Sequence, residues 1–238
     1  MEPKATIVAP DKEEDKSLSR KISDFISKRR VLFLSILGAI LAVVLAVGAY
    51  TLITQSARDN SSRALEVARA KVTAWAEETD EAKKAELDAA LHGELDTIIA
   101  KWAKSFAAQQ SLYIKASLFS SKQDWVNAEK YYLDAASLLP KTYLAPIALE
   151  NAAVSAEEQG KADKAFEYYG KIIADYVSDV PNLAHAHFSL GRLSEAKQDW
   201  KAALEHYQKL QSDFASSDWA LLAKNRIIFL KAQGYDKQ

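Results

Sequence analysis

Two stretches of the chain repeat one another: KQDWVNAEKYYLDAASLL at 122–139 and KQDWKAALEHYQKLQSDF at 197–214. Both open with the tetrapeptide Lys-Gln-Asp-Trp, and the two copies lie 75 positions apart. Each then continues with apolar residues at intervals of three and four, which is the spacing of one face of an α-helix. The aspartate stands where it can cap that helix. A repeated capped helix indicates a fold built from copies of one unit.

A third copy of the unit lies between these two. The segment GKADKAFEYYGKIIADY at 160–176 has the same helical pattern, with Ala162 in the place of Trp125 and Trp200. These three positions are separated by 37 and 38 residues. The expected helix ends follow the same spacing, at Trp102, Leu139, Tyr176 and Phe214. Four units in register are therefore expected, and AQGY at 232–235 is expected to correspond to the tetrapeptide that opens at Lys197.

These units resemble the tetratricopeptide repeat (TPR) family, in which each unit is a pair of helices. A small residue at the helix crossing lets the two helices approach, and an aromatic residue fills the space where they diverge. The period here is longer than the usual period of about 34 residues. The residues that carry the resemblance are Leu190 and Gly191, the crossing alanines Ala128, Ala165 and Ala203, the aromatics Tyr132, Tyr169 and Tyr207, and Pro140 at the end of a unit.

The expected fold is all-α, with one N-terminal transmembrane helix followed by a TPR-type α-solenoid of about four helix pairs and a C-terminal capping helix. The solenoid comprises a degenerate first pair at 63–104 and three repeats over 105–216, placed at 105–140, 144–177 and 183–215. The remaining ranges are a disordered cytoplasmic tail at 1–16, a basic juxtamembrane helix at 17–30, a transmembrane helix at 31–53, a connector at 54–62 in which that helix continues or breaks, and a capping helix and tail at 217–238.

Residues 31–53, VLFLSILGAILAVVLAVGAYTLI, contain no charge and no proline. As a helix this segment is about 35 Å long, enough to cross a hydrocarbon core of about 30 Å. Six basic residues precede it at 16–30, and only Arg58 and Arg63 follow closely. This asymmetry predicts a cytoplasmic N-terminus and a C-terminal domain outside the membrane. The alternative is a cleaved signal peptide, which the long lead and long apolar run disfavour.

Small residues recur inside the apolar segment at intervals of four. Gly38, Ala42 and Ala46 form a small-xxx-small pattern, which lets two membrane helices approach closely. Alanine-rich spans show this pattern often. A homodimer through the span is therefore an open possibility with no further support in the sequence.

The composition limits the classes of partner. The 238 residues carry a formal net charge of −1, and residues 54–238 carry 23 basic and 26 acidic side chains. This balance disfavours nucleic acid as a partner. The chain has no cysteine, which excludes disulfides and thiolate metal sites. Only seven glycines and five prolines are present, as expected for an almost wholly helical protein.

No motif for catalysis or cofactor binding is present in the sequence. It contains no glycine-rich phosphate loop, no nucleophile elbow and no His-Glu-x-x-His run. His185 and His187 are two positions apart, so on a helix they point in different directions and do not readily share a metal. We therefore expect no enzymatic activity, no cofactor and no metal. The remote alternative is a hydrolase or metal enzyme that uses His185, His187 and Glu158.

Aromatic residues in the repeats are interpreted first as packing residues. Trp125 and Trp200 open second helices and are expected to pack between adjacent units, with a role as recognition anchors as the alternative. His187 occupies a position that TPR units usually give to a packing aromatic, so a core role is expected. Trp219, at the start of the capping helix, is expected to be more exposed.

The resemblance implies a protein-binding groove lined by the first helix of each pair. The mixture of side chains at the corresponding positions suits a peptide or helix with apolar and some basic character. It lacks the lysine and asparagine set with which some TPR modules bind chaperone C-termini. The twelve positions are Gln110, Tyr113, Ser117 and Ser120 in the first repeat, Ile147, Glu150, Val154 and Glu157 in the second, and His185, Phe188, Arg192 and Glu195 in the third.

The expected function is that of a TPR scaffold for protein–protein interactions, anchored in the bacterial inner membrane by a single span with its repeats in the periplasm. Its partners would be proteins of the periplasm or inner membrane. The layout is similar to that of YfgM-like ancillary subunits of the SecYEG translocon, which implies clients that are exported proteins. The alternative is an accessory scaffold of an envelope-spanning machine, such as a flagellar motor or an outer-membrane assembly complex.

Overall fold

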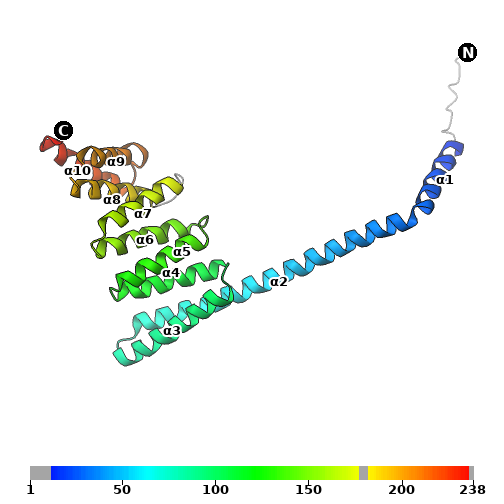
Figure 1. Ribbon diagram of the computed structural model, residues 1–238, viewed down its shortest axis with the longest axis horizontal. Coiled ribbons are helices and arrows are strands. Elements are labelled where there is room, and N and C mark those ends of the chain that lie inside the picture. Colours follow the sequence, from blue (N-terminus) through cyan, green and yellow to red (C-terminus); the bar gives the residue numbers. More distant parts are fainter. Residues whose placement is uncertain (1–11, 177–181, 236–238) are drawn as a thin grey trace, which may run out of the picture. The chain divides into compact units, whose positions relative to one another are not determined.

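The structure is a computed structural model that describes residues 12–176 and 182–235. In these residues it contains ten α-helices and no β-strand, which confirms the all-α prediction (Figure 1). The chain divides into two compact units, Met1–Ala57 and Arg58–Gln238. The helices are α1 (Lys12–Lys28), α2 (Arg30–Glu77), α3 (Glu81–Lys101), α4 (Phe106–Ser121), α5 (Trp125–Leu138), α6 (Leu144–Glu158), α7 (Ala162–Asp175), α8 (Leu183–Ala196), α9 (Trp200–Asp213) and α10 (Asp218–Ala232).

Helix α1 begins earlier than the sequence predicted. The predicted tail covers residues 1–16; residues 1–11 lie outside the described part of the chain, and 12–16 are helical. Lysine and glutamate favour helix, and acidic residues near a helix N-terminus interact favourably with its dipole. The sequence KEEDK at 12–16 meets both conditions. The predicted juxtamembrane helix is therefore longer at its N-terminus.

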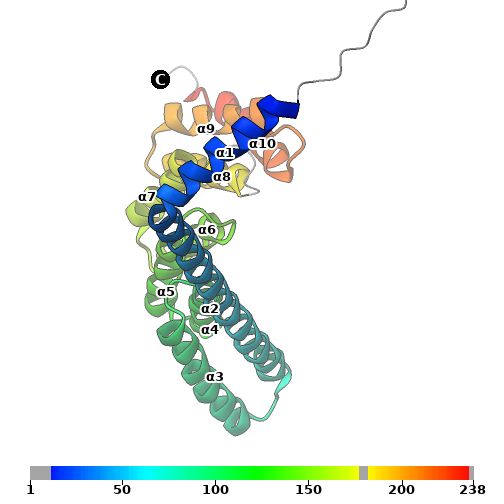
Figure 2. The same ribbon diagram turned by 90° about the vertical axis from the view of Figure 1, so that its right-hand side faces the viewer.

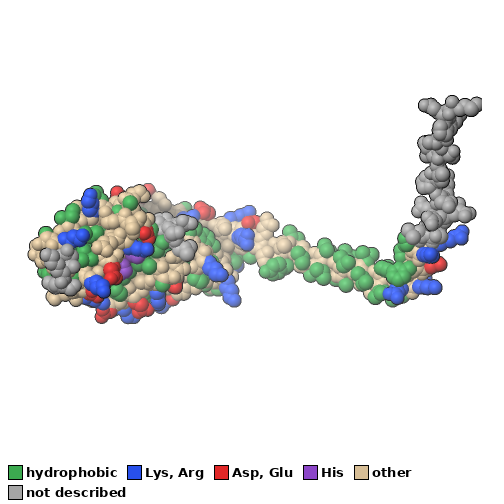
Figure 3. Space-filling model, turned by 90° about the horizontal axis from the view of Figure 1, so that it is seen from above, with side chains coloured by type: hydrophobic (Ala, Val, Ile, Leu, Met, Phe, Trp, Pro, Cys, Tyr) green, Lys and Arg blue, Asp and Glu red, His purple; other side chains and the backbone are tan. Residues whose placement is uncertain are grey.

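The apolar segment 31–53 lies in the N-terminal part of α2. By length and composition this helix can cross a membrane. The large apolar side chains of residues 31–53 are exposed; Val31 at the start is 71% exposed and Ile53 at the end is 69% exposed. Figure 3 shows hydrophobic side chains covering this part of the helix. The prediction of one N-terminal apolar helix is confirmed.

The predicted connector at 54–62 is part of α2, so the helix continues and does not break. The Thr54 hydroxyl donates to the carbonyl of Tyr50 at 2.9 Å, and the Ser61 hydroxyl donates to the carbonyl of Arg58 at 2.8 Å. Such bonds to the preceding turn satisfy hydroxyl groups inside a helix. The segment also contains no glycine or proline that would end it.

Within the unit Arg58–Gln238, successive helices stack as antiparallel pairs (Figures 1 and 2). We call α4, α6, α8 and α10, together with α2 from Arg58 onward, the first helices, and α3, α5, α7 and α9 the second helices. Three neighbouring clusters of buried side chains run along the stack, over α2–α4, α4–α8 and α8–α10. Each pair therefore buries its apolar face against its neighbours, as in other solenoids.

The repeated tetrapeptide forms the turn inside two of the pairs, α4–α5 and α8–α9. Gln123 and Gln198 adopt positive φ angles of 59° and 61°, and Gly160 has a φ of 73° at the same point of the repeat between them. The backbone N–H of Asp124 donates to the carbonyl of Phe119 at 3.0 Å, which closes the end of α4. The Asp124 carboxylate then accepts from the backbone N–H of Asn127 at 3.2 Å and caps α5. One short motif thus ends one helix and begins the next.

The crossing and packing residues occupy the predicted places. Ala128, Ala165 and Ala203 are fully buried, and Tyr132, Tyr169 and Tyr207 are at most 4% exposed. The four predicted helix ends are also confirmed, because Trp102, Leu139, Tyr176 and Phe214 are the C-cap residues of α3, α5, α7 and α9. The predicted alignment of the last unit was wrong by one residue. It placed Gln233 at the position of Gln198, whereas Gly234, with a φ of 78°, takes that place, so the last unit is one residue longer than predicted.

Candidate protein-binding groove

The twelve predicted groove residues lie on the first helices α4, α6 and α8. Most of them are partly exposed, whereas Gln110 is buried and Arg192 is exposed. Within each helix they recur at intervals of three or four, so each set follows one side of its helix. We call the surface that these residues form the first-helix face.

Acidic residues of the first-helix face are paired with basic residues of the next first helix. Glu150 on α6 contacts Nδ1 of His185 on α8. The Arg192 guanidinium donates to the two oxygens of Glu157 at 2.8 and 2.6 Å. Further along, Arg226 on α10 donates to Glu195 from Nε at 2.9 Å. These internal pairs occupy the carboxylates, so the face offers a basic ligand less free negative charge than the sequence predicted.

Each repeat also ties its first helix to its own second helix through a buried tyrosine. The Tyr169 hydroxyl donates to Glu157 at 3.0 Å, and the Tyr207 hydroxyl donates to Glu195 at 2.5 Å. Burial, and then the adjacent carboxylate, raises the pKa of both phenols. The tyrosines therefore stay neutral donors and hold the carboxylates in place for the pairs with the next repeat.

At the C-terminal end, Trp219 covers part of the first-helix face. Its indole stacks on the His185 ring at a centroid distance of 4.3 Å and lies 5.2 Å from the Phe188 ring. Trp219 is partly buried, as are Trp125 and Trp200, so its greater exposure stays a prediction. Helix α10 packs against α8 and α9, and its first turn brings this large side chain over α8.

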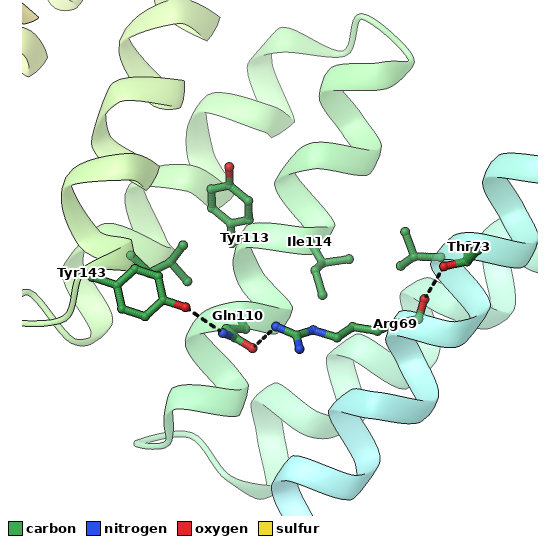
Figure 4. Close-up of a pocket in the computed structure, with 8 residues that line it drawn as sticks. Arg69, Thr73, Gln110, Tyr113, Ile114 and Tyr143 are labelled. Atoms are coloured by element: carbon green, nitrogen blue, oxygen red, sulfur yellow. Dashed lines mark hydrogen bonds between the residues drawn. The ribbon is translucent and has the colours of Figure 1, made fainter. Parts of the chain in front are cut away.

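At the N-terminal end, the first-helix face opens into a cavity of about 410 Å³ between α2, α4 and the start of α6 (Figure 4). Arg69 Nη2 donates to Gln110 Oε1 at 2.7 Å, and Gln110 Nε2 approaches the Tyr143 hydroxyl at 3.5 Å. The other walls are Val72, Thr73, Tyr113, Ile114 and Leu144. The cavity thus combines apolar walls with an arginine, an amide and two phenol groups.

The exposed aromatic residue Tyr143 lines this cavity, and Phe106 packs against Tyr143 outside the lining; we call this pair the cavity rim. Tyr143 is 67% exposed and its ring lies 5.7 Å from that of Phe106, which is 37% exposed. Large aromatic side chains at a surface supply much of the free energy of protein–protein contacts because they bury a large area at small entropic cost. The structure brings the predicted residues Gln110 and Tyr113 together here with Arg69 and Tyr143.

Sequence reasoning did not identify Arg69 or Tyr143 as site residues. Arg69 belongs to the degenerate first pair, where the repeat pattern is weak. Tyr143 is the residue before α6, outside the positions that the repeat pattern assigns to the groove. The signal that was available is the aromatic pair Phe106 and Tyr143, placed at the N-termini of two consecutive first helices.

The three residues of the enzyme alternative, His185, His187 and Glu158, do not form a common site. His185 contacts Glu150, Ser189 and Trp219, and Glu158 is exposed at the end of α6. His187 is 7% exposed, which places it in the core as predicted. No cluster of three or more His, Asp or Glu side chains suited to a metal ion occurs in residues 12–176 and 182–235.

His187 packs against His206 of α9. Their Nδ1 atoms are 3.2 Å apart, and the Phe214 ring lies 5.9 Å from the His187 ring. Burial lowers the pKa of His187 to about 4, with His206 and Lys209 acting in the same direction and Asp213 opposing them. Burial also lowers the pKa of His206, against an opposing effect of Glu205. Both rings are therefore neutral near pH 7.

The fold defines the class of the protein: an α-solenoid of helix pairs that follows an N-terminal apolar helix. No family model matches the chain. The chain is similar to a TPR repeat-containing protein of Treponema pallidum (strain Nichols), with 32% identity over 133 residues, which are 56% of this chain and 55% of that protein. It thus spans about half the length of this relative. The similarity supports the TPR family.

Proposed function

We propose that the protein is a membrane-anchored TPR scaffold whose first-helix face binds a segment of a partner protein at the cavity between α2, α4 and α6. The cavity with its exposed aromatic rim is the observation that supports this proposal. Similarity to a TPR repeat-containing protein supports a role in protein–protein interaction, and TPR solenoids typically act as scaffolds without catalysis.

The chemistry of the cavity favours a segment with one large apolar side chain next to a hydrogen-bond acceptor. Val72, Ile114 and Leu144 provide apolar walls, whereas Arg69 provides guanidinium N–H groups. The Arg69 side chain is 47% exposed and its Nη1 contacts Glu66 at 3.3 Å, which leaves other N–H groups for a ligand. Because the carboxylates of the face are paired internally, shape and apolar contact contribute more to recognition here than attraction of a basic ligand.

We further propose that the apolar part of α2 anchors the scaffold in the bacterial inner membrane, with the helix pairs in the periplasm. The six basic residues before the apolar segment support this orientation. In this arrangement the partners are proteins of the periplasm or inner membrane, including exported chains near the Sec translocon. Recovery of one stoichiometric complex, in place of varied exported chains, would favour an accessory subunit of an envelope machine.

The test is recovery of partners by crosslinking of the full-length protein in intact membranes, followed by mass spectrometry. Arg69→Ala and Tyr143→Ala are expected to reduce partner recovery at least about fivefold, as for residues central to an interface. Val126→Ala, which removes a side chain that is 63% exposed on α5, is the matched control and is expected to have no effect. Equal recovery by all three variants would contradict the proposal.

A further inference from the structure

Helix α10 carries an exposed apolar stripe on the side that faces away from α8 and α9. Leu221, Leu222, Ile228 and Phe229 are 64%, 45%, 58% and 47% exposed. Positions i, i+1, i+7 and i+8 share one face of an α-helix, and Asn225 lies in the middle of that face. Of the eight large hydrophobic side chains that are exposed in residues 58–176 and 182–235, four lie on this helix. The other four are scattered singly or belong to the cavity rim.

The opposite face of α10 is packed into the solenoid. Ala220, Ala223 and Leu230 are buried in the cluster that α8 and α9 complete. Arg226 is held by Glu195, and its guanidinium carbon lies 4.8 Å from the centre of the Phe229 ring. This contact restrains Phe229 before any partner arrives, which lowers the entropic cost of burying it.

The stripe is symmetric about Asn225. Leu221 and Phe229 are each four positions from Asn225, and Leu222 and Ile228 are each three positions from it. In an antiparallel pair of identical helices related by a two-fold axis at this residue, Leu221 of each copy lies opposite Phe229 of the other. A patch that matches itself in this way is the defining feature of a two-fold interface between identical chains.

We propose that α10 binds α10 of a second copy of this chain, antiparallel, about a two-fold axis at Asn225. The four apolar side chains of each copy interdigitate, as in other helix pairs with interaxial distances of about 8–10 Å. The two Asn225 amides meet at the axis, where each can donate to and accept from the other. A single polar residue inside an apolar helix seam fixes the register of the pair.

Charges at the ends of α10 fit the same register. Asp218 is seven positions before Asn225, and Lys231 is six positions after it. In the antiparallel pair, Asp218 of one copy therefore lies beside the turn of the other copy that carries Lys231. The two helix dipoles also oppose each other, which favours the antiparallel over the parallel arrangement.

Disulfide crosslinking tests this proposal directly because the chain contains no cysteine. In the full-length protein in membranes, Asn225→Cys places one thiol at the proposed axis, where the two Cα atoms come within disulfide range. Mild oxidation is expected to convert most of this variant to a covalent dimer. Gln208→Cys, at an exposed position on α9, is the matched control and is expected to crosslink at least about fivefold less.

A second variant separates this contact from dimerisation through the apolar helix. Leu221→Asp and Phe229→Asp, added to Asn225→Cys, place charge in the stripe at exposed positions and are expected to reduce the dimer at least about fivefold with helical content unchanged. A dimer yield from Asn225→Cys that does not exceed the Gln208→Cys control would overturn the proposal. So would a yield that the two aspartates leave unchanged, or crosslinks from position 225 that run mainly to other proteins.

Discussion

At Gly191, α8 and α9 approach so closely that a methyl group has no room. A Cβ atom added there would lie 2.5 Å from Cε1 and 2.8 Å from Cζ of Tyr207. The Tyr207 ring cannot move aside easily, because it is fully buried and its hydroxyl is bonded to Glu195. The glycine of the Leu190-Gly191 pair is therefore a packing requirement of this repeat.

Gly191→Ala is predicted to destabilise the protein by about 1–2 kcal/mol, since the overpacking penalty exceeds the gain in helix propensity. Gly170→Ala in α7 is the matched control, because an added Cβ there has no neighbour within 4 Å. That variant is predicted to stabilise by about 0.5–1 kcal/mol. Urea unfolding of the full-length protein in detergent, followed by tryptophan fluorescence, gives both values. Equal effects of the two substitutions would refute the packing argument.

The His187–His206 pair predicts a loss of stability in acid. The folded-state pKa of His187 is lowered to about 4 and that of His206 is also lowered, so the unfolded chain binds more protons as the pH falls below about 6.5. Their contribution is thus complete above this pH and is lost toward pH 4. Protonation of His187 in the unfolded chain alone lowers the free energy of unfolding by about 2 kcal/mol between pH 7 and pH 5. His187→Phe with His206→Gln should flatten this part of the pH profile of unfolding; an unchanged slope would exclude the pair as its cause.

At the level of the helix pair, one left-handed backbone position recurs in the turns of α4–α5, α6–α7 and α8–α9. Gln123 and Gln198 hold a left-handed backbone conformation that costs a non-glycine residue about 1–2 kcal/mol. Gly160 adopts the same conformation without this cost. The residue at this position therefore affects the stability of each of these three turns.

Gln123→Gly is predicted to stabilise the protein by about 0.5–1 kcal/mol, because relief of the backbone strain exceeds the added entropy of the unfolded chain. Gly160→Ala is predicted to destabilise by about 1 kcal/mol for the converse reason. The midpoints of urea unfolding measure both changes. A destabilising Gln123→Gly would show that the Gln123 side chain contributes more than its backbone conformation costs.

The helix pairs were predictable because their signals are local. Asp124 and Asp199 cap the helices that follow them by accepting from the backbone N–H three residues further on, and the buried tyrosines recur at the repeat interval. The continuity of α2 through 54–62 was not decided by sequence, because a polar segment without glycine or proline fits a helix or a connector equally. The one-residue error at Gly234 arose because AQGY shares only its glutamine with KQDW, which is too little to fix the alignment.

The candidate site was predictable only in part. Repeat positions identify the first-helix face, including Gln110 and Tyr113, because side-chain direction in a helix follows from spacing. The cavity depends on Arg69 and Tyr143, which lie 41 residues before and 33 residues after Gln110. The pairing of Glu157 with Arg192 likewise depends on how consecutive repeats stack, which spacing alone does not determine.

At the scale of the whole molecule, the proposed orientation predicts a distinct accessibility for each end. A single cysteine at Gln208 in this cysteine-free chain is expected to react with a membrane-impermeant maleimide in intact spheroplasts. A single cysteine in the first eleven residues is expected to react only after lysis, because the proposed orientation puts that end in the cytoplasm. The reverse pattern would show that the orientation is wrong.

The proposed function requires that a partner protein enters the cavity between α2, α4 and α6. The most direct measurement is photo-crosslinking from position 143 in intact membranes, compared with position 208 on α9. If a partner occupies the cavity, position 143 forms adducts with other proteins, and these decrease at least about fivefold on Arg69→Ala. Adducts from position 143 that do not exceed those from position 208, or that are insensitive to Arg69→Ala, would contradict it.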